Sequence, residues 1–380
     1  MAKNVTTRTA VMVVLGLLAA ACSGSEPQGG SSSEETISGT SVSPAPSTAD
    51  TSPPPPLPAL VYVSVGKDSR VAVLELGIDG TLTERPELSL DLPGSAGAMT
   101  YSAADGRLYV GAGNNISTLA VDETGAPTVL GTTPVDGEPV YLDLAAQDRV
   151  LAVAFFGEDE VRTYSIGEDL NSYPVQQADA WDIEPHSIVV NAAGTHAYVA
   201  HRNANSVGVY AIDESGTLSQ QSLVTDAGVG PRHIVLSSDG GFAFAVNEQG
   251  DTVTSFTIGA DGSLVLNNTV ATIPEGVDPD SNTGADIHVS PDGRFVYASN
   301  RGHDSIAIFS VDQAGQLTPL GHVPTQARPR DFGMSPDGRF IVVAGQDSGQ
   351  VESFAIGDDG TLTSVGSVPV GEGPVWVEIV

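Results

Sequence analysis

A phrase that recurs seven times along this 380-residue chain constrains its fold more than any other feature. Each copy ends an alternating, strand-like segment with a turn that contains Gly or Asp, as in LELGIDGTL, YAIDESGTL and FAIGDDGTL. Successive copies are separated by 45, 44, 47, 46, 53 and 45 residues. The turn residue falls at Gly80, Gly125, Asp169, Gly216, Gly262, Gly315 and Gly360. A period of this length indicates an array of structural repeats.

Each repeat is expected to contain four short strands. In one copy, PRHIVLS forms the first strand, SDGG turns, FAFAVN returns, TVTSFTI follows, and a Gly-Asp turn leads to the last strand. These segments are rich in β-branched and aromatic residues and have no helical period. Four strands in each repeat of 40 to 50 residues are typical of a β-propeller. The sequence therefore predicts an all-β fold, a seven-bladed β-propeller with four-stranded antiparallel blades.

The two ends of the repeat region predict how the ring closes. GEGPVWVEIV at the C-terminus matches the opening strand of a repeat, whereas LVYVSVGKDSRVAVLEL begins at the strand that should come next. We therefore expect residues 375–380 to join the N-terminal strands in one composite blade, which removes an open sheet edge. The predicted propeller domain covers residues 59–380.

The first 58 residues have a different composition. Lys3 and Arg8 precede the apolar run AVMVVLGLLAA, and small residues lead to Cys22, the one cysteine of the chain. This pattern predicts a signal peptide over residues 1–22. LLAAAC resembles a bacterial lipobox, which implies lipidation at Cys22, and an ordinary cleaved signal peptide is the alternative. Residues 23–58, rich in Ser, Gly and Pro, are expected to form a disordered tether. We thus expect an exported lipoprotein on the outer side of the cytoplasmic membrane or in the cell envelope.

The charge balance restricts the partners of the chain. With 15 Lys and Arg against 47 Asp and Glu, the formal net charge is −32. Such a surface repels nucleic acids and anionic lipids, so we expect no nucleic-acid partner and membrane contact only through the N-terminal anchor. No zinc, phosphate-loop or dinucleotide motif is present, and we expect neither a metal nor a cofactor. We also expect a monomer.

The repeats allow equivalent positions to be compared within the one chain, counted from the Gly in the turn between the first two strands of a repeat. Eight residues before this Gly lie Ala98, His186, Arg232, Ala285 and Arg330. Eight residues after it lie Asn114, Arg202, Glu248, Arg301 and Gln346. The start of one antiparallel strand and the end of its neighbour meet at the same edge. Both sets are therefore expected at one mouth of the central channel.

Positive charge is concentrated at these positions. They hold four of the seven cationic side chains after residue 200, namely Arg202, Arg232, Arg301 and Arg330. Arg binds carboxylate or phosphate groups through two parallel hydrogen bonds, and unlike charges gathered in a cleft often mark a site. We therefore predict an anion site, the alternative being that these charges only solvate a polar mouth. Glu248 and His186 could act as general base or acid there.

Three segments show a resemblance to a known family: GPRHIVLSSDGGFAFAVNE, ADIHVSPDGRFVYASNRGHDSIAIFSVD and RPRDFGMSPDGRFIVVAGQDSGQVESFAI. They resemble the lactonase family of seven-bladed propellers, which contains bacterial 6-phosphogluconolactonases and fungal carboxy-cis,cis-muconate cyclases. The likeness spans residues 60–380. In the cyclase branch a His, two Arg and a Glu are proposed to form the site. The matching motifs EPHSIVV, GPRHIV, AVNEQG and ASNRG imply the catalytic residues His186, Arg232, Glu248 and Arg301.

The resemblance implies hydrolysis of a sugar lactone, such as 6-phosphogluconolactone, without a metal. Arg232 and Arg301 would hold the anionic part of the substrate and polarise its carbonyl group. Glu248 or His186 would activate water. We expect further substrate contacts from Arg330, His233, Asp286 and Asp331. The last three each come directly after one of the positions counted eight residues before the turn Gly. For these three, a role in ordinary hydrogen bonding is the alternative. Two other functions stay open: cycloisomerisation of an unsaturated dicarboxylate, and a non-catalytic envelope propeller that binds a protein or a glycan.

Overall fold

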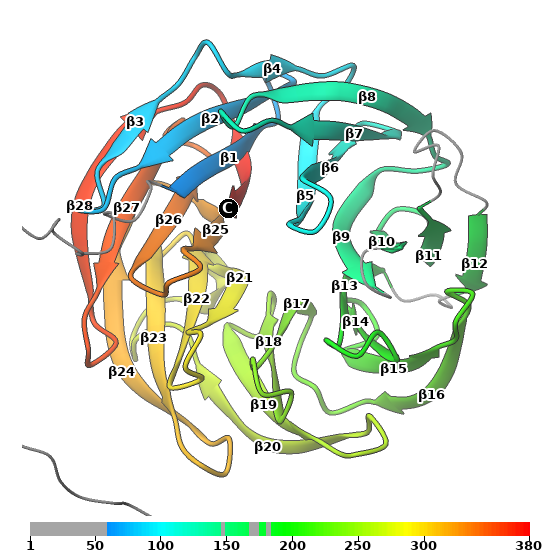
Figure 1. The fold of residues 1–380 in the computed structure, drawn as a ribbon. Coiled ribbons are helices and arrows are strands. Elements are labelled where there is room, and N and C mark those ends of the chain that lie inside the picture. The colour runs from blue at the N-terminus through cyan, green and yellow to red at the C-terminus, as the bar shows by residue number, and fades with distance from the viewer. Residues whose placement is uncertain (1–58, 146–148, 167–174, 180–183) are drawn as a thin grey trace, which may run out of the picture. The chain divides into compact units, whose positions relative to one another are not determined.

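The computed structural model describes residues 59–380 except 146–148, 167–174 and 180–183. The predicted signal peptide, the lipidation at Cys22 and the tether all lie outside the described residues. Within the described part, no helix has the length and hydrophobicity needed to cross a membrane. The described residues form seven antiparallel sheets around a central channel (Figure 1). The predicted seven-bladed β-propeller is therefore confirmed.

Six blades each use four consecutive strands, ordered from the channel outward. The first contains β5 (Ala96–Ser102), β6 (Arg107–Ala112), β7 (Asn115–Val121) and β8 (Pro127–Pro134). The second contains β9 (Pro139–Ala145), β10 (Val150–Phe155), β11 (Glu160–Ser165) and β12 (Val175–Asp179). The third contains β13 (Pro185–Val190), β14 (His196–His201), β15 (Ser206–Ile212) and β16 (Leu218–Val224).

The next three blades repeat the same order. The fourth contains β17 (Pro231–Leu236), β18 (Phe242–Asn247), β19 (Thr252–Ile258) and β20 (Leu264–Ala271). The fifth contains β21 (Thr283–Val289), β22 (Phe295–Arg301), β23 (Ser305–Val311) and β24 (Leu317–Pro324), preceded by the short 3-10 turn η1 (Pro279–Ser281). The sixth contains β25 (Pro329–Met334), β26 (Phe340–Gly345), β27 (Gln350–Ile356) and β28 (Leu362–Pro369).

The seventh blade combines both ends of the domain, as predicted. Its innermost strand is the C-terminal β29 (Pro374–Ile379), followed by β1 (Ala59–Val65) and β2 (Arg70–Leu76). The outermost position differs from the expected single strand, because β3 (Leu82–Glu84) and β4 (Leu90–Asp91) both pair with β2. Pro86 lies between them in a turn closed by the hydrogen bond from the Leu88 amide to the Arg85 carbonyl, and a Pro has no amide hydrogen to continue a ladder.

Hydrogen bonds at the recurring turn hold neighbouring blades together. Its residue has a positive φ at Gly80 (84°) and Gly125 (82°), a conformation that favours Gly. In all six copies whose turn residue the structure describes, a hydroxyl group of an adjacent blade donates a hydrogen bond to the carbonyl oxygen of that residue. The donors are Tyr62, Thr163, Tyr198, Ser255, Tyr297 and Ser353. The phrase that identifies the repeat is therefore also a contact that holds the ring together.

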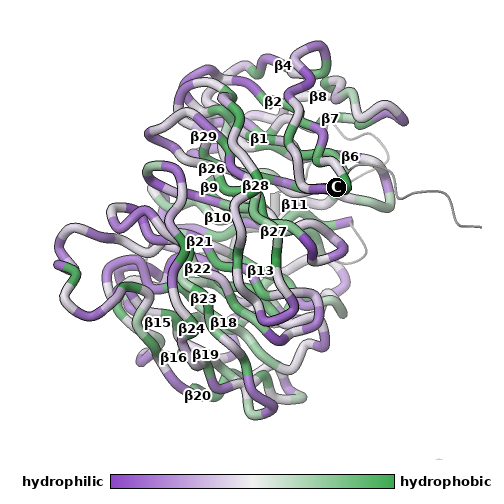
Figure 2. The backbone as a smooth tube through the Cα atoms, turned by 90° about the vertical axis from the view of Figure 1, so that its left-hand side faces the viewer, coloured by the Kyte–Doolittle hydropathy of each residue, from purple (hydrophilic) through white to green (hydrophobic). Residues whose placement is uncertain are grey.

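The hydrophobic core lies between adjacent blades. Phe244 and Val246 of β18, for example, pack against Val296 and Ala298 of β22, and all four are fully buried. Figure 2 shows hydrophobic residues along the strands and hydrophilic residues at the connecting turns. Burial of each large aliphatic or aromatic side chain contributes about 1.5 to 3 kcal/mol. This packing forms a rigid frame around the channel.

Candidate functional site

A bulge near the start of each innermost strand places the channel-lining residues. In all seven innermost strands, the register with the next strand shifts near the first residues. A bulge leaves an extra residue unpaired, so consecutive side chains need not alternate between two faces. Arg232 with His233, and Arg330 with Asp331, accordingly line one and the same cavity. The extra residues in five of the strands are Val140, His186, Arg232, Arg330 and Val375.

Three arginines surround the carboxylate of Glu248 at the mouth. Its Oε2 lies 2.9 Å from Nε of Arg202 and 3.7 Å from Nε of Arg232, and its Oε1 lies 2.8 Å from Nη2 of Arg301. Burial by itself would raise the pKa of Glu248, but the charges of Arg232, Arg301 and Arg202 outweigh it and hold the pKa below its usual value. Glu248 is therefore an ionised centre that keeps the arginines together.

Backbone carbonyl groups fix two of these guanidinium groups further. Nη1 of Arg232 donates to the carbonyl oxygen of Ala285 at 2.6 Å, and Nη2 of Arg301 donates to that of Gly284 at 2.9 Å. Arg330 differs, because its guanidinium group has no hydrogen bond or ion pair within the part of the chain that the structure describes. It thus offers free donors to a bound molecule.

Arg330 opens into a cavity of about 220 Å³ at the channel mouth. The cavity has a positively charged wall in Arg232 and Arg330, an aromatic wall in Trp376, and polar groups in Glu138 and Gln346. Small-molecule sites combine such apolar surfaces with a few converging polar groups. The cavity therefore has the character of a pocket for a small, oxygen-rich molecule.

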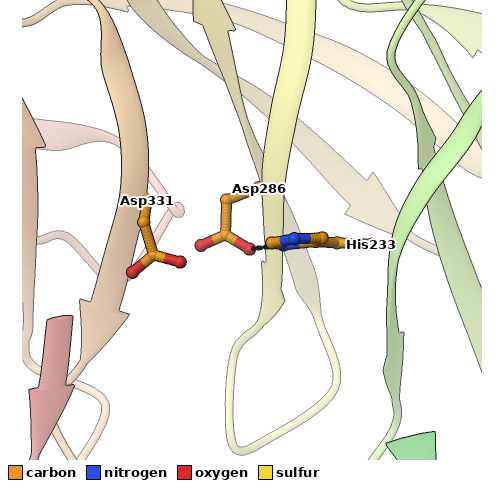
Figure 3. Close-up of side chains that lie close together, drawn as sticks. All are labelled: His233, Asp286 and Asp331. Atoms are coloured by element: carbon orange, nitrogen blue, oxygen red, sulfur yellow. Dashed lines mark hydrogen bonds and ion pairs between the residues drawn. The ribbon is translucent and has the colours of Figure 1, made fainter. Parts of the chain in front are cut away.

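A second layer of side chains lies deeper in the channel. Nδ1 of His233 is 2.7 Å from Oδ1 of Asp286, and Oδ2 of Asp286 accepts from the Phe332 amide at 3.1 Å and lies 3.2 Å from Nε2 of His288. Figure 3 shows Asp286 between His233 and Asp331. Oδ1 of Asp331 accepts a hydrogen bond from the Val377 amide at 2.8 Å.

Burial and close contact shift the pKa values of this layer. Burial, followed by the charge of Arg232, lowers the pKa of His233 to about 4. Burial would raise the pKa of Asp286, but His288 and His233 hold it well below its usual value. Burial, followed by the charge of Asp286, raises the pKa of Asp331 well above its usual value. At neutral pH the layer therefore holds a neutral His233 imidazole beside an ionised Asp286, and the same burial favours the neutral form of the Asp331 carboxyl group.

These three side chains are also where a cation could bind. Among the described residues, His233, Asp286 and Asp331 form the one group whose potential ligand atoms all lie within 4.8 Å of one another (Figure 3). The 2.7 Å between His233 and Asp286 is the length of a hydrogen bond. The expected absence of a metal stays a prediction.

The channel continues into a second cavity of about 210 Å³. Asp331 and Trp376 line both cavities, whereas Asp143, His288 and Glu378 line the second and not the first. Burial raises the pKa of Glu378 to about 8, so its carboxyl group is mostly protonated at neutral pH. The second layer thus separates a cationic mouth from a chamber rich in carboxyl groups.

The structure brings the predicted site residues to the channel in two groups. Arg232, Glu248 and Arg301 contact one another. His186 does not contact Glu248; its ring centre lies 5.2 Å from that of His233 and 5.4 Å from that of Phe156. Four further predicted residues line or border the pocket, namely Arg330, His233, Asp286 and Asp331. Their catalytic and binding roles stay predictions.

Three contacts were missed from the sequence. Arg202 was counted at the mouth but not assigned to the site, and it forms an ion pair with Glu248. Tyr141 and Trp376 have ring centres 5.1 and 5.9 Å from that of His233. The alignment of GPVW with GPRH places Trp376 in the slot of His233 and could have found it.

The fold and the site together define a β-propeller with a charged small-molecule pocket at one mouth of its channel. The family model described as "Lactonase, 7-bladed beta-propeller" matches residues 61–379. The chain belongs to this lactonase family.

Relatives and a solved structure agree with this assignment. The chain is 32% identical to a 6-phosphogluconolactonase of Pectobacterium carotovorum over 279 residues, which covers 71% of this chain and 83% of the relative. It is 31% identical to the 6-phosphogluconolactonase of Sodalis glossinidius with the same coverage. The structure of the periplasmic gluconolactonase PpgL of Pseudomonas aeruginosa matches with a TM-score of 0.76 and 25% identity, covering 85% of this chain and 99% of that one.

Proposed function

We propose that this propeller hydrolyses a sugar lactone in the pocket at the arginine-lined mouth of its channel. The observation that carries the proposal is the guanidinium group of Arg330, which has no partner among the described residues and faces the same cavity as Arg232 in a member of the lactonase family. The relatives named 6-phosphogluconolactonase and gluconolactonase support a six-carbon sugar lactone as the substrate.

The chemistry of the reaction fits the charges at the mouth. Attack of water on a lactone carbonyl builds negative charge on the carbonyl oxygen, and fixed positive groups lower the barrier most when they point at that oxygen beforehand. Arg330 has free donors for this oxygen or for an anionic substituent of the sugar. Arg232 is held by Ala285 and Glu248 and adds a positive charge that does not reorganise during the reaction.

We also propose that the protein works outside the cytoplasmic membrane, attached by a lipid at Cys22. The basic and apolar residues that lead to LLAAAC support export and lipidation. The name of the Pseudomonas relative, a periplasmic gluconolactonase, supports a lactone substrate in that compartment. The substrate of an exported enzyme need not carry phosphate, so glucono-lactone and its 6-phosphate are both candidates.

Lactone hydrolysis by the full-length chain in mild detergent, followed by proton release, tests the proposal. We expect turnover of glucono-lactone or its 6-phosphate above the spontaneous rate, with and without EDTA. Arg330→Ala should lower kcat/KM about 10- to 100-fold, since a hydrogen bond to a charged group contributes about 1.5 to 3 kcal/mol. Arg294→Ala is the matched control, because Arg294 is 58% exposed, pairs with Asp292 and bonds to the Asp358 carbonyl oxygen, and does not line the mouth cavity.

Two results would contradict the proposal. A folded wild-type protein that turns over neither lactone is not the proposed lactonase. Unchanged kinetics of the Arg330→Ala variant would show that the pocket at the mouth is not the active site. NMR of the product distinguishes a hydroxy acid, expected from hydrolysis, from an isomer of the substrate.

A further inference from the structure

Glu248 and His186 are poorly placed to accept a proton from water. Three arginines contact the Glu248 carboxylate and occupy its oxygen atoms, and Glu248 is not among the residues that line the mouth cavity. His186 lies outside the residues that line the mouth cavity, and within the described residues its buried Nδ1 has no hydrogen-bond partner that would fix the ring.

His233 is held differently. Its Nδ1 lies 2.7 Å from Oδ1 of Asp286, and the ionised carboxylate can only accept, so Nδ1 carries the hydrogen. Nε2 is then the nitrogen with the free lone pair. This Nε2 is buried and has no hydrogen-bond partner within the described residues, although His233 lines the mouth cavity beside Arg232 and Arg330. A buried ring nitrogen without a partner is costly unless a ligand or a water molecule uses it.

The carboxylate of Asp286 is itself fixed. Its Oδ2 accepts a hydrogen bond from the Phe332 amide on β25 and lies 3.2 Å from Nε2 of His288 on its own strand. Tyr141 and Trp376 flank the ring of His233 with edge-on and tilted contacts. These contacts leave the imidazole one orientation, with Nδ1 toward Asp286.

We propose that His233 is the general base of the lactone hydrolysis and that Asp286 is its positioning residue. The proposal rests on the proposed lactonase function. Nε2 of His233 takes a proton from water while the water oxygen bonds to the lactone carbonyl carbon, and the carbonyl electron pair moves to its oxygen, facing Arg330. When the intermediate collapses, the bond between this carbon and the ring oxygen breaks. The ring oxygen then takes the proton back from Nε2, which yields the hydroxy acid.

The environment of His233 predicts a pH profile. The charged and titratable groups that face it come from five strands, namely Tyr141, His186, Arg232, Asp286, Arg330 and Asp331. Burial and Arg232 place its pKa at about 4, so the imidazole is neutral and able to accept a proton above that pH. We expect kcat/KM to rise as pH increases through about 4 and to be level from there to neutrality. Asp286 raises the pKa of His233, so Asp286→Asn should move the rise to lower pH.

Three variants of the full-length protein test the assignment. His233→Gln should lower kcat at least 100-fold with KM changed less than about threefold, because base catalysis contributes 10²- to 10⁴-fold. Asp286→Asn should lower kcat about tenfold or more and shift the acid limb of the profile. His322→Gln is the control and should keep wild-type kinetics, since His322 lies on the outer strand β24 and bonds to the carbonyl oxygen of Thr272.

A measurement on the wild type covers the case in which a variant does not fold. Long-range ¹⁵N NMR of the histidine rings should find the proton of His233 on Nδ1 at neutral pH. A proton on Nε2, or a folded His233→Gln variant with wild-type kcat, would overturn the assignment while leaving the lactonase activity in place. A wild-type protein without turnover would instead contradict the proposed lactonase function itself.

Discussion

At the scale of single residues, Glu248 holds the mouth together. Its side chain is 12% exposed and contacts Arg202, Arg232 and Arg301. We expect Glu248→Gln to lower the free energy of unfolding at pH 7 by about 3 to 5 kcal/mol, because Arg232 and Arg301 are left buried without this counter-charge. Urea denaturation measures this loss. The exposed Glu214, changed to Gln, is the control and should alter stability by less than about 0.5 kcal/mol.

The same prediction has a pH dependence. The folded pKa of Glu248 lies below its unfolded value, so its contribution is present above about pH 4.3 and is lost as pH falls through the folded pKa. The difference between wild type and Glu248→Gln should therefore shrink on acidification below about pH 4. A difference that is constant from pH 7 to pH 3 would show that the charge of Glu248 is not what stabilises the mouth.

At the scale of strands, the architecture could be predicted from the sequence, and part of the site could not. The seven copies of the turn phrase are local patterns that can be seen directly in the sequence. Counting the strands at both ends of the repeat region predicts that Val375 to Val380 provide one strand of the composite blade. Counting equivalent positions in the repeats also predicted that Arg232 and Arg301 lie at the same mouth of the central channel. The bulges depend on pairing between separate strands, so no local pattern showed that Arg232 and His233 share a cavity. The hydrogen bond between His233 and Asp286 likewise depends on how two blades pack.

The pairing of β29 with β1 makes the ring closure testable. Leu60 and Val380 exchange both backbone hydrogen bonds, so the next pair, Val61 and Ile379, is not hydrogen-bonded and its Cα atoms are close enough for a disulfide. Val61 belongs to a core cluster, and the partly buried Ile379 packs against the same cluster. In the double variant Val61→Cys, Ile379→Cys, the bridge would close a loop of nearly the whole domain.

Oxidation of this double variant should raise its Tm by about 5 to 10 °C over the reduced form, because a bridge across a long loop contributes about 4 to 5 kcal/mol. The comparison of oxidised and reduced forms of one protein removes the packing cost of the two substitutions. Differential scanning calorimetry with and without a reductant gives the result. Equal Tm values for the two forms, with the bridge verified by mass spectrometry, would mean that separation of β29 from β1 does not limit the stability of the ring.

At the scale of the whole molecule, the net charge restricts how the protein can be attached to a membrane. The formal net charge of −32 repels the anionic lipids of a bacterial membrane, while three of the arginines at the mouth pair with Glu248. The propeller therefore has no electrostatic attraction for a membrane surface. The proposed attachment therefore depends on the N-terminal region, where acyl chains on Cys22 would each add about 0.8 kcal/mol per buried methylene group.

Replacement of the single cysteine therefore tests whether a lipid at Cys22 attaches the protein to a membrane. Two or more acyl chains give stable anchoring, so the wild type should sediment with membranes, resist extraction by 1 M salt and dissolve in detergent. Cys22→Ser should move to the soluble fraction after cell disruption, because the acidic domain adds no binding of its own. Mass spectrometry of the N-terminal peptide checks the modification directly. If Cys22→Ser still sediments with membranes and is released by salt, a partner rather than a lipid holds the propeller at the membrane.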